Sequence, residues 1–233
     1  LDYLQGILEN EPYNYTLKCD TLNAISFGAP QRRERFIMVG LKKDLNIEYT
    51  YPEATFTEGS YRTVRDAISD IQDIEPGKEV TDSYFTLPPH PEAQGLEKEL
   101  RGRCLHNHIT TATRETALSR FKALKAGENF HDLSPELKTT YSNAERTQNT
   151  IYMRLKYDEP SGTVVNVRKS MWIHPELDRA ISIREAARLQ TFPDSFIFEG
   201  TKDSQYQQVG NAVPPFLAKA VAESIISILD QVQ

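Results

Sequence analysis

The sequence predicts a mixed α/β protein, because strand and helix patterns both occur along its 233 residues. Residues 15–22 place apolar side chains at alternate positions and residues 36–41 form a nearly continuous apolar run, and both patterns are typical of strands. Gly28 and Pro30 lie in the connection between them, which favours an antiparallel hairpin. At the other end of the chain, residues 216–229 repeat apolar side chains at helical spacing.

Further elements are predicted between these two ends. Helices are expected at residues 64–71 and 116–125, and Gly127 is a suitable cap for the second one. Residues 151–155 and 163–167 are expected to be strands, because a strong turn signal rich in proline and glycine separates them.

A capping box marks the start of another helix. Ser182 and Glu185 have the spacing at which each side chain bonds the other's backbone N–H. The helix is expected to end near Phe192, because the residue before a proline avoids the helical conformation. Arg184 and Arg188 then lie one turn apart, a repulsive spacing that is explained by a solvated face or by an anionic partner.

The C-terminal helix follows a turn. The pair Gly210-Asn211 suits a tight turn with positive φ, and Pro214 and Pro215 open the helix. Its apolar stripe needs a partner surface and consists of Leu217, Val221, Ile225 and Leu229, with Ala218 and Ala222 beside it.

The charge distribution allows nucleic-acid binding although the net charge is −6. The acidic side chains concentrate in residues 44–100, whereas residues 101–125 carry six basic side chains and one acidic one. Residues 31–43 are also basic. Local basic patches, and not the total charge, determine a phosphate footprint, so one side of this chain can bind DNA.

Composition excludes several classes of protein. With 39% hydrophobic and 26% charged residues the chain can bury a core, and it is not a disordered chain. No apolar run approaches the roughly 18 residues of a membrane span. Cys19 and Cys104 give no disulfide framework, which suits a reducing cytosol. No metal is expected, because the candidate zinc ligands Cys104, His106, His108 and His90 are irregularly spaced.

Three stretches together resemble a known family. They are GAPQRRERF at residues 28–36, REAARLQTFPD at residues 184–194, and QVGNAVP at residues 208–214. They are similar to the eighth, ninth and tenth sequence blocks of DNA cytosine-5 methyltransferases, and they occur in the family's order.

The resemblance implies a fold and a division into domains. The chain would be the C-terminal part of a Rossmann-like methyltransferase domain with an inserted α+β target-recognition domain. Residues 1–44 and 203–233 would belong to the catalytic domain, and residues 45–202 would form the recognition domain.

The family's earlier blocks are missing from this sequence. They hold the nucleophilic cysteine in a Pro-Cys dipeptide, the cofactor on a glycine-rich turn, and the base through a Glu-Asn-Val block, whereas here Cys19 follows Lys18 and Cys104 follows Arg103. The chain also begins without methionine and within a helical pattern. We therefore expect an N-terminal half, either on the same polypeptide or as a separate subunit of a split enzyme.

The resemblance implies roles for the residues in the matching blocks. Arg33 and Arg35 would reach the flipped cytosine and its flanking phosphate, a task for which planar guanidinium groups are suited. Gln31 would order that loop, and Arg32 would contact DNA beside it. One side of the S-adenosylmethionine pocket would be closed by Asn211, Ala212 and Val213.

The region between the blocks would read the DNA sequence. Arg114 and Arg120, in the basic segment, are candidate phosphate contacts. Thr163-Val164 resembles a threonine-plus-aliphatic pair of the family's recognition region, and Thr163 could bond a base edge or contact a thymine methyl group. The alternative is that residues 163–167 are only a core strand.

The function implied is methyl transfer from S-adenosylmethionine to C5 of a flipped cytosine in a specific duplex site. Double-stranded DNA and the N-terminal half would be its partners, with no membrane involved, in the nucleoid-associated cytoplasm of a prokaryote. A non-catalytic sequence-specific DNA-binding subunit or decayed relative is an alternative function. The tRNA-methylating branch of the family is a further one, disfavoured by the long insert.

Overall fold

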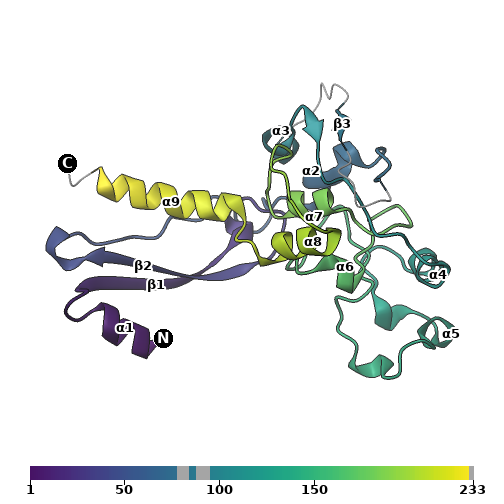
Figure 1. Ribbon diagram of the computed structural model, residues 1–233, viewed down its shortest axis with the longest axis horizontal. Coiled ribbons are helices and arrows are strands. Elements are labelled where there is room, and N and C mark those ends of the chain that lie inside the picture. The colour runs from purple at the N-terminus through teal and green to yellow at the C-terminus, as the bar shows by residue number, and fades with distance from the viewer. Residues whose placement is uncertain (78–83, 88–94, 231–233) are drawn as a thin grey trace.

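The computed structural model describes residues 1–77, 84–87 and 95–230. Its N-terminal part is an antiparallel hairpin of β1 (Tyr15–Asn23) and β2 (Glu34–Lys42), in which Cys19 lies opposite Met38. The expected hairpin is therefore confirmed. It projects as a long arm from the rest of the molecule (Figure 1).

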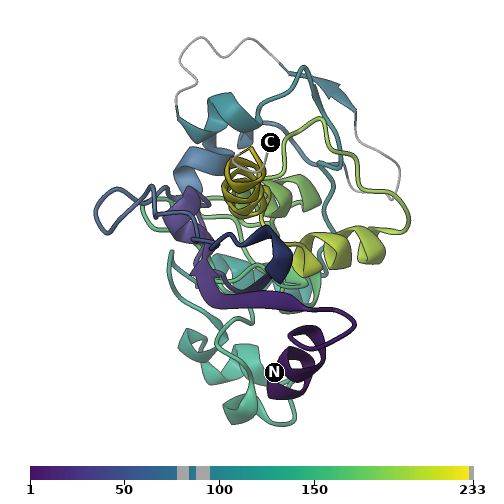
Figure 2. The same ribbon diagram turned by 90° about the vertical axis from the view of Figure 1, so that its left-hand side faces the viewer.

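Two helices flank the arm on opposite sides. Helix α9 (Pro215–Leu229) runs along one side of the hairpin, and α1 (Asp2–Leu8) lies on the other, as the end-on view also shows (Figures 1 and 2). Val39 and Leu41 of β2 pack with Ile228 of α9. The predicted terminal helix is thus confirmed, but its buried side includes Leu217 and Ile228, whereas Leu229 is exposed.

The body of the molecule surrounds a larger apolar core. It is formed around α2 (Val64–Ile68), α7 (Ile183–Leu189) and α8 (Lys202–Asn211), and it includes Trp172 and Phe198. The same body contains α3 (Leu96–Leu100), α6 (Val167–Ser170), β3 (Phe85–Thr86) and β4 (Cys104–Leu105).

A second cluster of apolar side chains lies under α4 (Glu115–Ala123) and α5 (Pro135–Lys138), where Phe121, Phe130 and Tyr152 pack together. Short 3₁₀ turns connect the main elements: η1 (Ala24–Phe27), η2 (Lys43–Leu45), η3 (Ser69–Ile71), η4 (Phe130–Asp132) and η5 (Ala144–Arg146).

The strands predicted at residues 151–155 and 163–167 are wrong. The structure has only an isolated bridge between Arg154 and Ile173 in the first stretch, and the second runs into α6. Val164 and Val167 are buried in the body core, which explains their apolar character without a strand. The backbone N–H of Val164 bonds a glutamine side chain instead of a neighbouring strand.

The turn expected at Gly210-Asn211 is also wrong, because both residues lie in α8, a helix that the sequence did not predict. Gly210 is required there for a different reason: a Cβ would lie 2.7 Å from the carbonyl carbon of Val165. Gly127 does not cap α4 either, since the helix ends at Ala123. It does adopt positive φ.

Among the described residues, no single helix is long and apolar enough to cross a membrane. Helices α8 and α9 meet the same length and composition criteria only when they are taken together, with a bend of 43° between them.

Candidate functional site

The loop before β2 meets two segments that are distant in the sequence. One is a loop at residues 161–166, and the other is residues 209–216, which include the end of α8. They are called the recognition loop and the cofactor segment after the roles that the sequence predicts for them. Backbone bonds of 2.9 Å join Arg32 N–H to Ser161 and Ser161 N–H to Pro30. Thr163 Oγ1 donates to the Arg32 carbonyl at 2.8 Å.

Gln31 is buried between the recognition loop and α7. Its side-chain oxygen accepts from Val164 N–H at 2.7 Å, and its amide nitrogen donates to the Leu189 carbonyl at 3.1 Å and to Gln190 Oε1 at 3.3 Å. The side chain of Gln31 therefore orders this loop from within, and it does not lie on the surface.

Arg33 is buried and connects the recognition loop to the cofactor segment. Nη1 donates to the Val164 carbonyl, while Nη2 donates to the carbonyls of Gly210 and Ala212 at 2.6 and 2.9 Å. Its Nε is also buried and has no hydrogen-bond partner in the described part of the chain. The Arg33 guanidinium therefore connects the recognition loop to the cofactor segment by hydrogen bonds. A contact between Arg33 and the substrate stays a prediction.

Arg35 is half-buried and lies near the start of β2, two residues after Arg33. Nη1 donates to the carbonyl of Glu34 at 2.8 Å, and partial burial lowers the pKa of the guanidinium. Unlike Arg33, it keeps donors that a substrate can reach.

The exposed rim of this junction combines residues predicted for DNA and residues predicted for cofactor. Arg32, Thr163 and Asn211 are exposed, and so are Val165 and Val213, at 44% and 40%. The two halves of the rim touch, because Asn166 donates to Gln207 at 3.1 Å and Gln207 donates to Asn211 at 2.8 Å. The structure thus brings Arg32 and Thr163, predicted for DNA, next to Asn211, predicted for the cofactor.

The predicted phosphate contacts on α4 are not part of this junction. Arg120 is buried, where it donates to the Leu137 carbonyl at 2.7 Å and to Tyr152 Oη at 2.8 Å, so its expected place on the surface is wrong. Arg114, at the start of the same helix, is exposed. Of this pair, Arg114 remains the candidate phosphate contact.

The two arginines of α7 are buried, so the solvated-face interpretation is wrong. Arg188 binds Asp194 through two bonds of 2.8 and 2.6 Å and also binds Asp70. Burial alone would lower the pKa of Arg188, but these two carboxylates raise it above its usual value. Arg184 donates to backbone carbonyls, and its burial lowers its pKa to about 10.

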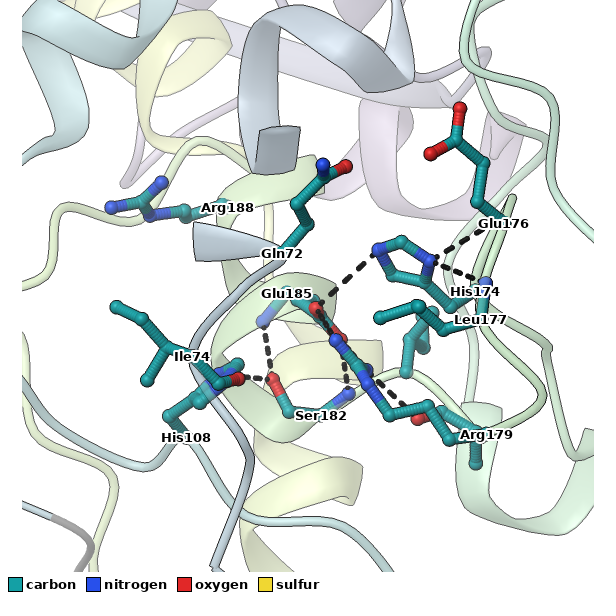
Figure 3. A network of polar contacts seen from close by, with 12 residues as sticks. Gln72, Ile74, His108, His174, Glu176, Leu177, Arg179, Ser182, Glu185 and Arg188 are labelled. Atoms are coloured by element: carbon teal, nitrogen blue, oxygen red, sulfur yellow. Dashed lines mark hydrogen bonds and ion pairs between the residues drawn. The ribbon is translucent and has the colours of Figure 1, made fainter. Parts of the chain in front are cut away.

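A second buried network lies beside these arginines (Figure 3). Glu185 accepts two bonds of 2.7 and 2.8 Å from Arg179, which outweighs the effect of burial and lowers the pKa of Glu185. Ser182 and Glu185 form the predicted capping box, which is confirmed. Residue spacing alone does not reveal the histidines of this network, because its members come from segments far apart in the sequence.

The histidines of this network are neutral structural groups. His108 Nε2 donates to the Ile74 carbonyl at 2.9 Å, so Nδ1 accepts from Ser182 Oγ, also at 2.9 Å. Burial lowers the pKa of His108, and it lowers the pKa of His174 to about 4. Although a serine and a histidine are paired here, both are buried, and Ser182 Oγ also caps α7.

Within the described residues, no group of three or more His, Cys, Asp or Glu side chains is placed to hold a metal ion. Of the candidate zinc ligands, His108 is held by the network above, and His90 lies outside the described residues.

The fold is a mixed α/β fold of the DNA methyltransferase type. The model of the family "C-5 cytosine-specific DNA methylase" matches residues 3–227, so the chain belongs to this family. It is 35% identical to the type II methyltransferase M.DdeI of Desulfomicrobium norvegicum, over 96% of this chain and 58% of the relative. It is also 35% identical to the type II methyltransferase M1.HphI of Haemophilus parahaemolyticus, over 94% of this chain and 50% of that relative.

A solved structure agrees with this fold. A protein described as a prophage-encoded DNA modification methyltransferase from E. coli superposes with a TM-score of 0.74 at 24% identity, over 93% of this chain and 61% of that one. The chain thus spans about half to three fifths of the length of the relatives it matches.

Proposed function

We propose that this chain is the C-terminal portion of a DNA (cytosine-5)-methyltransferase. It would transfer a methyl group from S-adenosylmethionine to C5 of a flipped cytosine in a specific duplex site, together with an N-terminal half. The observation that carries this proposal is the junction at which Gln31 and Arg33 join the recognition loop to the cofactor segment. Residues 1–44 and 203–233 would complete the catalytic domain, and residues 45–202 would recognise the target.

The hairpin arm supports the need for an N-terminal half. Within the described residues β1 and β2 have no further strand beside them, and a two-stranded sheet is marginal in water. Phe36 and Met38 lie on the opposite face of β2 from Val39 and Leu41. There Phe36 is 52% exposed and Met38 is half-buried. Such an apolar face is expected where further strands and helices of a larger sheet domain pack.

The cofactor segment has the chemistry that the predicted pocket wall needs. Val213 presents an exposed apolar side chain beside Pro214, which suits contact with an adenine ring. Asn211 is exposed and retains its amide nitrogen as a donor for polar groups of the ligand, while its oxygen accepts from Gln207. Ala212 would contact the cofactor mainly through its backbone. The bound cofactor would supply an electrophilic methyl group.

The chain's own residues would hold DNA against that methyl group. Arg35, with free donors near the rim, would contact the flipped cytosine or its phosphate. Arg32 would contact the sugar-phosphate backbone of the DNA, and Thr163 would approach the edge of a base. The position of these groups on one rim supports a duplex lying across the recognition loop.

The nucleophile would come from the other half. Cys19 lies half-buried on β1, and Cys104 Sγ lies 3.0 Å from Tyr84 Oη, so neither has the setting of an activated thiolate. The same lack of a suitable thiol favours the second candidate, a non-catalytic DNA-binding subunit. Only the first candidate, the methyltransferase portion, predicts methyl transfer once an N-terminal half is supplied.

Labelled S-adenosylmethionine and mixed-sequence duplex DNA test the two candidates. The chain alone is expected to transfer no label, and the chain combined with an N-terminal half that contains Pro-Cys is expected to label cytosine C5. Robust transfer by the chain alone would contradict the proposal. Sequence-specific binding by the combined protein, without transfer, would support the second candidate. The protein is expected to act in the cytoplasm of a prokaryote, on nucleoid DNA.

A further inference from the structure

The two residues that follow α7, Gln190 and Thr191, bind the first and the last part of the cofactor segment. Gln190 Nε2 donates to the carbonyl of Val209, and Thr191 Oγ1 accepts from the N–H of Phe216 at 3.1 Å. Gln190 and Thr191 are themselves fully buried. Two consecutive residues thereby fix the start and the end of the stretch that contains Asn211.

Gln190 also continues the bonds that begin at the recognition loop. Val164 N–H donates to Gln31 Oε1 at 2.7 Å, and Gln31 Nε2 donates to Gln190 Oε1 at 3.3 Å. Together with the bond to Val209, these contacts form an uninterrupted amide chain from the recognition loop to the cofactor segment. The direct tie made by Arg33 runs beside it.

The backbone at Thr191 indicates that this position is set by its surroundings. Its φ is +66°, a left-handed conformation that a β-branched residue rarely adopts. Such a conformation persists only where the surrounding structure fixes it. Here it directs the hydroxyl group to the first turn of α9.

We propose that Gln190 and Thr191 are positioning residues that couple the recognition loop to the cofactor segment, so that cognate duplex and cofactor raise each other's affinity. This inference rests on the proposed function. A duplex that contacts Thr163 or Val165 orders the loop and, through the amide chain, the residues around Asn211. The cofactor then loses less conformational freedom when it binds second, and the effect is reciprocal.

The test uses the chain combined with its N-terminal half and the duplex that this wild-type enzyme methylates. Calorimetry gives the Kd of S-adenosylhomocysteine with and without that duplex, and the ratio of the two values measures the coupling. We expect a wild-type ratio of about fivefold or more. Gln190→Met should lower the ratio, because it removes both amide contacts and leaves each binding surface intact, whereas the direct bonds of Arg33 remain.

Gln205 provides a matched control. It is a buried glutamine that donates to a backbone carbonyl, that of Gly200 at 2.9 Å, and accepts from a side-chain amide, that of Asn107 at 3.0 Å. Gln205→Met therefore removes the same kinds of bond outside the amide chain, and it should leave the coupling ratio unchanged even if it lowers thermal stability.

Thr191 gives an independent pair of variants if Gln190→Met does not fold. Thr191→Val keeps the shape but loses the acceptor of the Phe216 N–H and should reduce the ratio, whereas Thr191→Ser keeps the acceptor and should retain it. Hydrogen exchange at Val164 and Phe216 should slow when duplex binds the wild-type enzyme, and this change should shrink in Gln190→Met.

Two results overturn the inference. One is a wild-type ratio of one, and the other is a folded Gln190→Met or Thr191→Val variant that keeps the wild-type ratio. A wild-type enzyme that binds duplex but transfers no methyl group overturns the proposed function instead, and this is seen before any variant is made.

Discussion

The body and the hairpin arm differ in how they accommodate side chains that are unfavourable where they lie: buried charges in the body and exposed apolar groups in the arm. In the body, even the charged groups of α7 are buried and paired within the chain, as Arg188 is with Asp194 and Asp70. In the arm, α9 buries Leu217 and Ile228 but leaves Ile226 and Leu229 exposed. Apolar groups that stay in water are normal when single, whereas an apolar strand face and helix face together mark an interface. The body thus pairs its buried charges within the chain, whereas the arm leaves apolar side chains exposed, as the proposed N-terminal half requires.

The largest expected effect comes from breaking the pairing inside the body. Arg188→Met should lower the free energy of unfolding by about 3–5 kcal/mol, because it removes the buried cation that Asp194 and Asp70 share. Asp70 keeps its pair with Arg101, and Asp194 keeps the Gly102 N–H. Urea denaturation of the chain measures this. Arg168→Met is the matched control, since the pair of Arg168 with Asp203 is largely exposed and should contribute about 1 kcal/mol or less. Equal losses in both variants would contradict the description of the body as closed.

Acid should destabilise the body through His174. Its pKa is lowered to about 4 in the folded protein, mainly by burial, while a histidine in an unfolded chain titrates near pH 6.5. Below about pH 6.5 the unfolded state therefore binds the extra proton. Stability is lost as the pH falls toward 4, by about 2–4 kcal/mol for this group.

His174→Asn tests this dependence, because its side-chain oxygen can still accept the N–H groups of Glu176 and Leu177 that bond His174 Nδ1. The variant should have a smaller fall in the free energy of unfolding between pH 6.5 and 4. His131→Gln, on the exposed surface, serves as the control. An unchanged pH dependence in His174→Asn would show that protonation of His174 does not oppose folding.

A pair of isoleucines in α9 compares a covered and an open position directly. Ile228 is 8% exposed and packs against β2, whereas Ile226 is 55% exposed. Ile228→Ala should cost about 2–4 kcal/mol of folding free energy, and Ile226→Ala about 0.5 kcal/mol or less.

The same pair tests the proposed interface. Ile226→Asp should leave the stability of the chain nearly unchanged but weaken its association with the N-terminal half, which analytical ultracentrifugation measures. Normal association of Ile226→Asp would mean that this side of α9 stays in solvent.

The elements predicted correctly are those specified by neighbouring residues. The hairpin follows from two short apolar stretches around a turn, and the start of α7 follows from Ser182 and Glu185, which are three positions apart. Arg184 and Arg188 were predictable as helical residues but not as buried ones. Asp70, the second partner of Arg188, lies 118 positions away along the chain.

The errors also have physical causes. The valines at residues 164–167 were predicted to form a strand because of their apolar character, whereas the side chain that bonds the N–H of Val164, that of Gln31, lies 133 positions away. Gly210 was taken for a turn residue, but it is needed because the recognition loop packs against α8. Of the site, Gln31, Arg33 and Asn211 were singled out from the three stretches, whereas Gln190 of the second stretch was not, since its role depends on contacts with two distant segments.

The smallest expected effect concerns the recognition loop, which lies where body and arm meet. Arg114→Ala, in the body, should weaken binding to all duplexes alike and lower the salt slope by about 1 if Arg114 contacts a phosphate. Thr163→Ala should instead reduce discrimination between cognate and scrambled duplexes, by about 1 kcal/mol. This is the lower end of the range for a base contact, because Thr163 Oγ1 already donates to the Arg32 carbonyl and must give up or share that bond.

Binding of the combined enzyme to both duplexes at several salt concentrations separates the two effects. Thr163→Ser keeps the hydroxyl group and loses the methyl group, and Thr163→Val does the reverse, so the pair shows which group reads the base. If Thr163→Ala keeps the cognate preference, Thr163 serves only to hold the recognition loop to Arg32, and the reading of bases must be assigned to other exposed residues such as Val165.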